Sequence, residues 1–209
     1  MCFGVQVQVL LWTPIKILEV NILDNKDRFT DIVRKYIKRD GIDKLMYYLA
    51  ESDFYIAPAS TKYHDSENGG LLTHSLNTYD ELVKLVKFYD LDVSDESVAI
   101  VALFHDLCKI DCYDKSFRNV KKDGVWVQEP CFIWNEKLKY GGHGAKSVFI
   151  VNKFIKLTED EAIAIHNHMG PQGTDFSCMD AYRASPLSFL LHVADMASTI
   201  DALHDETAF

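Results

Sequence analysis

The spacing of apolar residues predicts a chain built mainly from amphipathic helices. Apolar positions recur every three or four residues in the segments 25–38, 42–49, 71–86, 94–107, 140–154, 158–168 and 186–200. Ser94 is a typical N-cap residue, and Thr158 with Glu161 three residues later forms a capping box. Residues 53–68 and 173–184 lack the helical period and are rich in small polar residues, so we expect loops there.

One segment, 113–137, interrupts the helical pattern. Within it, residues 119–131 hold two apolar-alternating runs around a turn at 121–124, which predicts a β-hairpin. Three aromatic side chains in this segment could roof a pocket or could hold the hairpin against the helical core, and we favour the second role for most of them. They are Trp126, Phe132 and Trp134.

The first 14 residues are apolar but do not resemble a signal peptide. No basic residue precedes the apolar run, and the segment is too short and too polar to cross a membrane. Val5, Val7 and Val9 alternate with glutamines, which predicts a short half-buried strand, unless the ordered domain begins further along the chain. Five scattered cysteines indicate reduced thiols. We therefore expect a cytoplasmic protein without membrane association.

The length of 209 residues favours one compact domain over two. We expect an all-α domain over residues 1–209, with its core at about 69–205. Residues 1–60 would add a strand and helices that pack on this core, and the hairpin would be an insertion. The helices leave room for a homodimer interface.

The net charge is acidic, with 22 Lys and Arg against 31 Asp and Glu, a formal charge of −9. An acidic surface argues against a broad nucleic-acid-binding face, so we expect no long nucleic acid as a partner. A small anionic substrate could still enter a locally positive pocket that holds a metal.

The most informative stretch is 102–110, where His105 and Asp106 lie side by side among apolar residues. Burying an imidazole or a carboxylate without a partner costs several kcal/mol, on the order of the desolvation penalty of an unpaired polar group. Two partners would remove this cost: a metal ion bound by both groups, or a hydrogen bond between the two side chains.

Other ligand-type residues recur in similar places, near a helix end and within an apolar stripe. They are His74, His143, His168 and Asp195. A single histidine on an apolar face is usually a packed core residue, but five separate helices with this feature favour one shared site. In a helical bundle such residues can converge on a metal in the core.

These residues and their order resemble the motif of the HD-domain metal-dependent phosphohydrolase superfamily. The segment 69–76 (GGLLTHSL) is similar to its first-histidine segment, and 105–109 (HDLCK) is similar to its His-Asp motif. Asp195 in 191–195 (LHVAD) is similar to its distant aspartate. The resemblance runs from Gly69 to Leu203 and implies an HD-type helical bundle.

The resemblance also implies roles for the individual residues. His74, His105, Asp106 and Asp195 would hold one metal, as in the family. His143 and His168 resemble the branch that holds a second metal, with Asp106 as the bridge. One or two divalent transition metals (Mn, Fe, Co, Ni or Zn) suit such a set of nitrogen and oxygen ligands.

Four further residues are candidates for supporting roles. Lys109 follows Asp106 by three and would contact the substrate phosphate or transition state, its alternative being a surface salt bridge. His166 would line the pocket or lie on the surface, and Arg118 could meet substrate phosphates. His192 precedes Asp195 by three and would support the metal site as a hydrogen-bonding partner, or pack in the core.

The function expected from these features is hydrolysis of a phosphomonoester or phosphodiester bond in a small nucleotide-like substrate. Metal-activated water would be the nucleophile. Two alternatives stay open. One is a di-iron oxygenase acting on a small molecule, since some HD-fold proteins use the same ligand pattern for oxygen chemistry. The other is a ligand-binding protein without catalysis.

Overall fold

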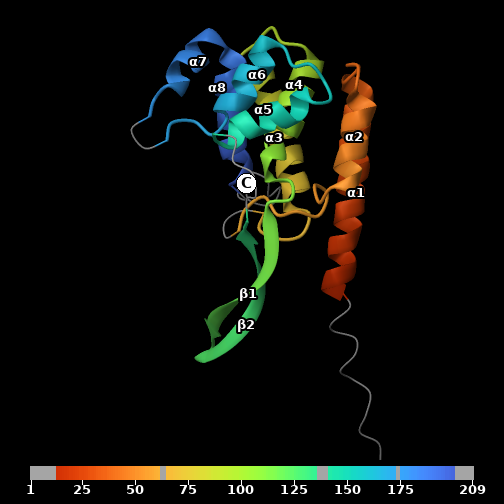
Figure 1. The fold of residues 1–209 in the computed structure, drawn as a ribbon, viewed down its shortest axis with the longest axis vertical. Coiled ribbons are helices and arrows are strands. Elements are labelled where there is room, and N and C mark those ends of the chain that lie inside the picture. Colours follow the sequence, from red (N-terminus) through yellow and green to blue (C-terminus); the bar gives the residue numbers. More distant parts are fainter. Residues whose placement is uncertain (1–12, 62–64, 136–140, 173–174, 201–209) are drawn as a thin grey trace, which may run out of the picture.

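The structure is a computed structural model that describes residues 13–61, 65–135, 141–172 and 175–200. These residues form a mainly helical fold with one two-stranded antiparallel sheet (Figure 1). The helices are α1 (Thr13–Tyr36), α2 (Ile42–Glu51), α3 (Gly70–Phe88), α4 (Asp95–Phe104), α5 (His143–Asn152), α6 (Glu159–Asn167), α7 (Cys178–Ala184) and α8 (Pro186–Ser198). The strand predicted at 5–9 lies outside the described residues.

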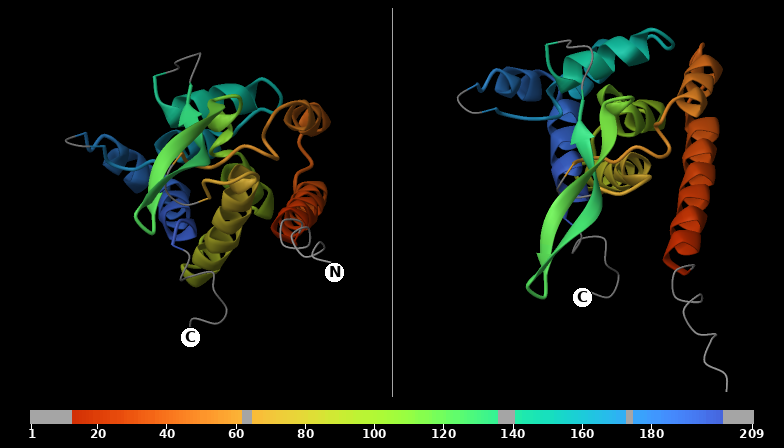
Figure 2. Two further views of the ribbon diagram at one scale, coloured as in Figure 1. Left: turned by 90° about the horizontal axis from the view of Figure 1, so that it is seen from below. Right: turned by 60° about the horizontal axis from the view of Figure 1, so that its bottom comes forward.

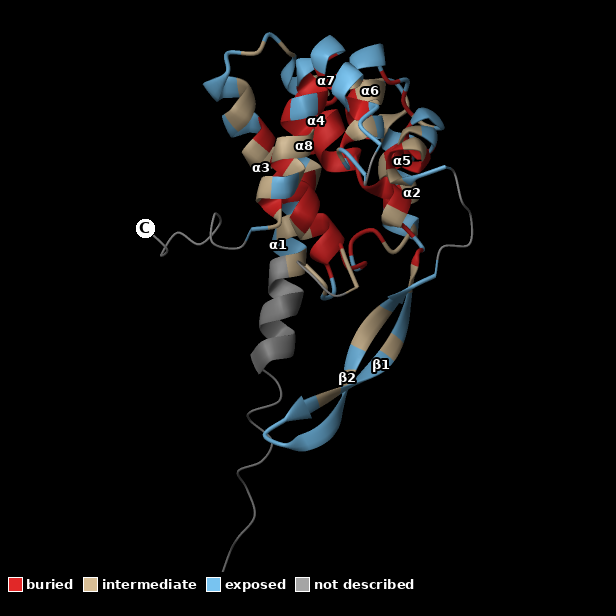
Figure 3. Ribbon diagram, turned by 90° about the vertical axis from the view of Figure 1, so that its left-hand side faces the viewer, coloured by how far each residue is buried: buried red, intermediate tan, exposed pale blue. Residues whose placement is uncertain are grey.

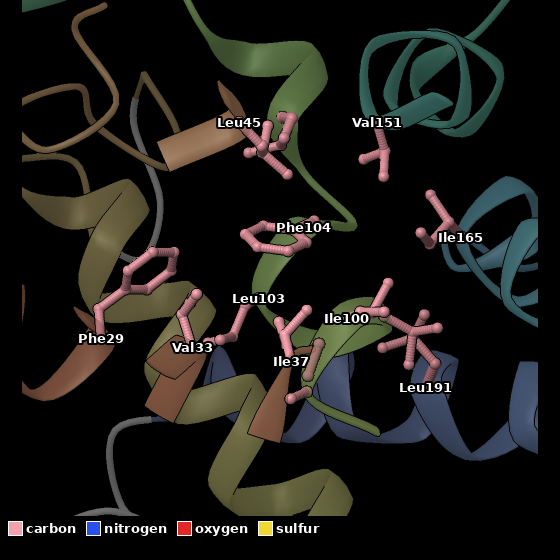
Figure 4. Close-up of a cluster of buried hydrophobic side chains, with 14 of the residues drawn as sticks. Phe29, Val33, Ile37, Leu45, Ile100, Leu103, Phe104, Val151, Ile165 and Leu191 are labelled. Carbon is pink, nitrogen blue, oxygen red and sulfur yellow. The ribbon is translucent and has the colours of Figure 1, made fainter. Parts of the chain in front are cut away.

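Helix α4 lies at the centre of the bundle. Its residues 98–104 are all buried, and α1, α3 and α6 pack around it. Figure 4 shows Phe104 of α4 among side chains from other helices, including Phe29 of α1 and Leu45 of α2. A helix that is apolar on every side can only be stable when it is surrounded. The segment that carries His105 and Asp106 therefore belongs to the longest continuously buried stretch of the described residues, 98–108.

The predicted helix starts are confirmed where a capping residue marks them. The Ser94 hydroxyl accepts a hydrogen bond from the backbone N–H of Ser97, and Thr158 and Glu161 form a reciprocal capping box. Helix α1 differs, because it begins at Thr13 and not near residue 25. The sequence contains Pro14 there, and proline in the first turn of a helix does not interrupt it.

The loop predicted at 173–184 is wrong from residue 178 onward, where α7 forms. Cys178 and Tyr182, one helical turn apart, are its buried residues, and the Tyr182 ring packs against Phe189 of α8. A helix of seven residues is too short to show a period in the sequence. Contacts with α8 stabilise it instead.

The hairpin is longer than predicted and extends away from the helices (Figures 1 and 2). Strand β1 (Tyr113–Lys122) pairs with β2 (Val125–Trp134) through a two-residue turn in which Asp123 and Gly124 both have positive φ. This is the turn type that tight hairpins favour. Figure 3 shows that the hairpin has no buried residue, whereas the helical part has many.

This position corrects the expectation for Trp126 that the hairpin's aromatic residues hold it against the core, whereas Trp134 does reach the helices, because its ring stacks on His143 of α5. Trp126, near the tip, is 68% exposed and cannot do so. Phe132 and Trp134 contact Tyr113 at the base of the hairpin. The cross-strand pairing of the backbone stabilises the arm, and this pairing needs no contact with the helices.

Arg39, between α1 and α2, connects this region with α4 and α6. Its guanidinium donates to both carboxylate oxygens of Glu161, at 2.6 and 3.1 Å, and to Glu96 at 3.1 Å. The Glu161 side chain is fully buried and also completes the capping box of α6. The carboxylate of Glu161 thus caps the N-terminus of its own helix and also pairs with Arg39, which is distant in sequence.

Within the described part of the chain, no helix combines the length and the apolar character that a membrane span needs.

Candidate metal centre

Four chain segments that are distant in sequence bring five of the predicted ligands together. His74 lies near the start of α3, and Asp195 lies in α8. His105 and His168 are the C-cap residues of α4 and α6, with the same helical backbone angles. Helices α4 and α6 thus each end at a histidine whose ring faces the other ligand-type residues.

The first group consists of His74, His105 and Asp195, whose ligand atoms all lie within 4.8 Å of one another. His74 Nε2 lies 3.2 Å from His105 Nε2 and 3.1 Å from Asp195 Oδ1, and His105 Nε2 lies 3.7 Å from the same oxygen. Ligands about 2.0–2.2 Å from a tetrahedral cation are roughly 3.3–3.6 Å apart, so these distances suit a cation between them.

The two oxygens of Asp106 face different sides of the site. Oδ2 lies 3.3 Å from His74 Nε2 and 3.5 Å from His105 Nε2. Oδ1 lies 3.4 Å from His168 Nε2. His105, Asp106 and His168 form the second group of atoms that could hold a metal. Asp106 is therefore placed between the first group and His168.

Backbone carbonyl oxygens next to His105 and His168 show which ring nitrogen of each histidine carries the hydrogen. His105 Nδ1 lies 2.8 Å from the carbonyl oxygen of Ala102, and His168 Nδ1 lies 2.7 Å from that of Ile165. A carbonyl oxygen can only accept, so both Nδ1 atoms carry a hydrogen and donate it. In the neutral ring, Nε2 is then free of hydrogen and can bind a metal.

His74 has the same tautomer for a different reason. The Ser198 hydroxyl donates its only hydrogen to the carbonyl oxygen of Asp195 and accepts a hydrogen bond from Thr78. His74 Nδ1, 3.1 Å from Ser198 Oγ, must therefore donate to it. Thr78 and Ser198 were not among the residues predicted from the sequence. Their spacing, four after His74 and three after Asp195, was the available signal.

The electrostatics of the group call for a positive charge at its centre. Burial lowers the pKa of His74, but hydrogen bonds to Asp106 and Asp195 outweigh burial and raise this pKa to about 9. Burial raises the pKa of Asp195, but hydrogen bonds from His105 and His74 outweigh burial and bring this pKa well below its usual range. The pKa of Asp106 is likewise well below its usual range despite burial, because of Lys109 and His105.

The residues present fit a metal ion. Two hydrogen-free nitrogens cannot face each other at 3.2 Å, as those of His74 and His105 do, without a cation or a proton between them. His168 Nε2 is fully buried and makes no hydrogen bond to the described residues, although Asp106 lies beside it. Imidazole nitrogens and carboxylate oxygens together are a typical set of ligands for first-row transition metals.

Lys109 lies beside Asp106, although α4 does not continue to it. The helix ends at Phe104, and a 3₁₀ turn (Leu107–Lys109) follows. Lys109 Nζ lies 2.6 Å from Asp106 Oδ2 and its side chain is 12% exposed, so this ion pair is not a surface salt bridge. Burial lowers the pKa of Lys109, but the charge of Asp106 outweighs burial and raises it, which keeps the lysine cationic.

The structure does not place His143, His166 or Arg118 in either ligand group. His143 begins α5, and its ring stacks on Trp134 with centroids 5.4 Å apart. His143 and the exposed His166 line one hollow of about 180 Å³ beside the site. Arg118 lies on the hairpin, half-exposed and 3.8 Å from Glu129.

His192 supports a different residue from the one expected. Its Nδ1 lies 2.7 Å from the backbone carbonyl oxygen of His168, and its ring stacks on Tyr182. It therefore holds the backbone of a ligand-type residue. Gly170 makes this contact possible, because a Cβ atom there would lie 2.4 Å from the His192 ring.

We expect Gly170→Ala to destabilise the fold by about 1–3 kcal/mol, since it adds both this clash and strain at a φ of +69°. Denaturant unfolding would measure the change. Gly124→Ala is the matched control, because Gly124 also has positive φ (+84°) but no atom within 4 Å of an added Cβ. Equal losses in the two variants would show that the His192 contact contributes nothing.

No protein-family model, no curated protein and no solved structure matches the chain. The structure therefore shows a mainly helical protein with groups of His and Asp residues that could bind metal. This arrangement is compatible with an HD-like site.

Proposed function

We propose that the chain is an HD-type metal-dependent phosphohydrolase that cleaves a phosphomonoester or phosphodiester bond in a small nucleotide-like substrate. The observation that supports this most is the set of three buried histidines, His74, His105 and His168. Each donates Nδ1–H outward, so that in the neutral ring it is the hydrogen-free Nε2 that faces the carboxylates. The order of these residues along the chain resembles the superfamily motif.

The proposed roles follow from which atoms lie together. His74, His105, Asp195 and Oδ2 of Asp106 would hold one cation, and Oδ1 of Asp106 with His168 would hold a second. A divalent cation in such a site lowers the pKa of water and stabilises negative charge on phosphoryl oxygens. Mn, Fe, Co, Ni and Zn are all compatible with these ligands. His143 stays a predicted ligand for the second cation.

Lys109 favours a hydrolase over a di-iron oxygenase. Its ammonium group lies at the edge of the cluster, is kept cationic by Asp106, and can attract a phosphate group. A phosphoester is always anionic, whereas the small-molecule substrate of an oxygenase need not be, so this charge fits the hydrolase better. Lys109 would thus bind the anionic substrate, and Asp106 would position Lys109 as well as the metal.

A substrate panel tests the proposed function. The protein would be loaded separately with each of the five metals and incubated with p-nitrophenyl phosphate, bis-p-nitrophenyl phosphate and nucleoside monophosphates. We expect metal-dependent release of phosphate or nitrophenol that a chelator abolishes and added metal restores. Oxygen consumption by the iron-loaded protein, with no phosphoester cleaved under any metal, would favour the oxygenase.

Metal counting tests the two-cation arrangement separately. We expect His168→Ala to lower the metal content from two ions per chain to one, because Asp106 Oδ1 then has no imidazole beside it. Elemental analysis after removal of loosely bound metal would measure this. His166→Ala is the control, since His166 is exposed two residues away. A native content of one ion per chain would contradict the second site.

A further inference from the structure

The hairpin has two faces of different chemistry. Side chains alternate along a strand, and residues paired across strands share a face. The register therefore places the odd-numbered residues of β1 and the even-numbered residues of β2 on one side, which we name the aromatic face. It carries five aromatic rings, those of Tyr113, Phe117, Trp126, Phe132 and Trp134.

The charges separate in the same way. The aromatic face carries Lys115 and Lys121 and no carboxylate. On the opposite face, Glu129 takes up both cations, with Lys122 at 2.5 Å and Arg118 at 3.8 Å. Lys115 and Lys121 are exposed and form no ion pair with the described residues. The net positive charge of the aromatic face is thus available to a partner.

The aromatic rings become more exposed toward the tip of the hairpin. Phe117 is 69% exposed and Trp126 is 68% exposed. Nearer the base, Lys115, Phe117 and Phe132 line a hollow of about 430 Å³ whose other wall is formed by residues 66–68, with the exposed Glu67 among them. Large rings left in water together indicate a binding surface. Aromatic rings are also enriched in protein–protein interfaces, but lysine is depleted there, so the two lysines favour a partner that carries phosphates.

We propose that the aromatic face binds single-stranded nucleic acid. Unpaired bases would stack on the exposed rings, and the phosphates would lie near Lys115 and Lys121. Surfaces that bind single strands combine these two features. The chain's net charge of −9 argues against a broad nucleic-acid surface, but one strand on one hairpin face needs only local positive charge. A duplex would offer no free base faces to the rings.

The aromatic face also leads toward the candidate metal centre. At its base, Trp134 stacks on His143, and β1 begins four residues after Lys109. A ten-residue strand spans about 30 Å, so a bound strand could extend from the tip to the region of the site. The idea that one end of the bound strand is also the substrate of the metal centre rests on the proposed function. Binding of the strand to the aromatic face does not depend on that function.

Fluorescence anisotropy tests the binding without metal. The probes are labelled twelve-nucleotide oligothymidylate and oligouridylate, in chelator and at low salt. We expect Trp126→Ala to weaken binding roughly tenfold to a hundredfold, the usual effect of removing one stacking ring. Phe88→Ala is the matched control, because Phe88 is 78% exposed at the end of α3. It should leave binding unchanged.

Two neighbouring lysines test the role of charge. Lys121→Ala and Lys122→Ala remove the same charge from opposite faces. Each phosphate contact to a single strand contributes about −0.7 to the slope of log K against log salt. We expect Lys121→Ala to make the slope less steep by about 0.7 and Lys122→Ala to leave it unchanged.

Several results would overturn the proposal. They are absence of binding at low salt, equal losses in Trp126→Ala and Phe88→Ala, and tighter binding of a duplex than of either single strand. A dimer that Trp126→Ala converts to a monomer, with no oligonucleotide bound, would assign the face to a second copy of the chain. Oligonucleotide binding by a protein that cleaves no phosphoester would contradict only the proposed hydrolase.

Discussion

Asp106→Ala should abolish metal binding and phosphoester cleavage together. Asp106 is the residue whose two oxygens face both ligand groups, so its loss removes a ligand from each. Loss of a residue that only supports a ligand lowers metal affinity by about 10- to 100-fold, and loss of a shared ligand should exceed that. Elemental analysis and the substrate panel would measure both effects in the same preparation.

Two further variants separate this effect from misfolding. Asp106→Ala leaves the buried Lys109 without its carboxylate, so Asp106→Ala with Lys109→Met removes both charges and should fold better. Asp195→Asn is the matched comparison, because Asp195 belongs to the first ligand group only. It should retain one of two ions. Full metal content or phosphate release by folded Asp106→Ala would rule out its bridging role.

Arg39→Ala should be strongly destabilising although Arg39 lies outside the metal centre. It leaves the fully buried carboxylate of Glu161 without its cation, and breaking a buried ion pair in this way costs about 3–5 kcal/mol. Hydrogen bonds from Thr158 and Ser97 remain, so we expect the lower end of this range. Chemical denaturation would measure the free energy of unfolding.

The control for this prediction is Arg28→Ala. Arg28 also pairs with a carboxylate, that of Asp80, but both side chains are more than a third exposed. Exposed pairs contribute about 0–1 kcal/mol, so this variant should be nearly neutral. Arg39→Ala with Glu161→Gln should recover part of the lost stability, because no buried charge is left unpaired. A neutral Arg39→Ala would mean that Glu161 needs no cation.

Local signals in the sequence predicted most of the helices. Capping at Ser94 and Thr158 is decided by side chains within three residues, so it can be seen without the fold. The turn at Asp123-Gly124 is equally local, because positive φ at both positions suits these residues. The early start of α1 and the presence of α7 were not predictable in this way. Short or weakly patterned helices depend on contacts with the rest of the chain.

The hairpin shows the limit of residue-type reasoning most clearly. The alternation of its residues predicted the pairing but not the direction of the arm. Aromatic residues such as Trp126 suggested contact with the core, yet the strands pair in solvent. Whether an apolar ring is buried depends on what stands opposite it, and this is a property of tertiary structure.

The sequence by itself determined which residues could bind metal. A histidine or carboxylate inside an apolar stripe is costly unless it has a partner, and this cost is readable from the chain. Only the tertiary structure decided which of them meet: His74, His105, Asp106, His168 and Asp195 converge, and His143 does not join their groups. It also decided which ring nitrogen of each histidine faces the centre. That choice depends on outer partners such as Ser198, which lies 124 residues from His74 along the chain but 3.1 Å away in the fold.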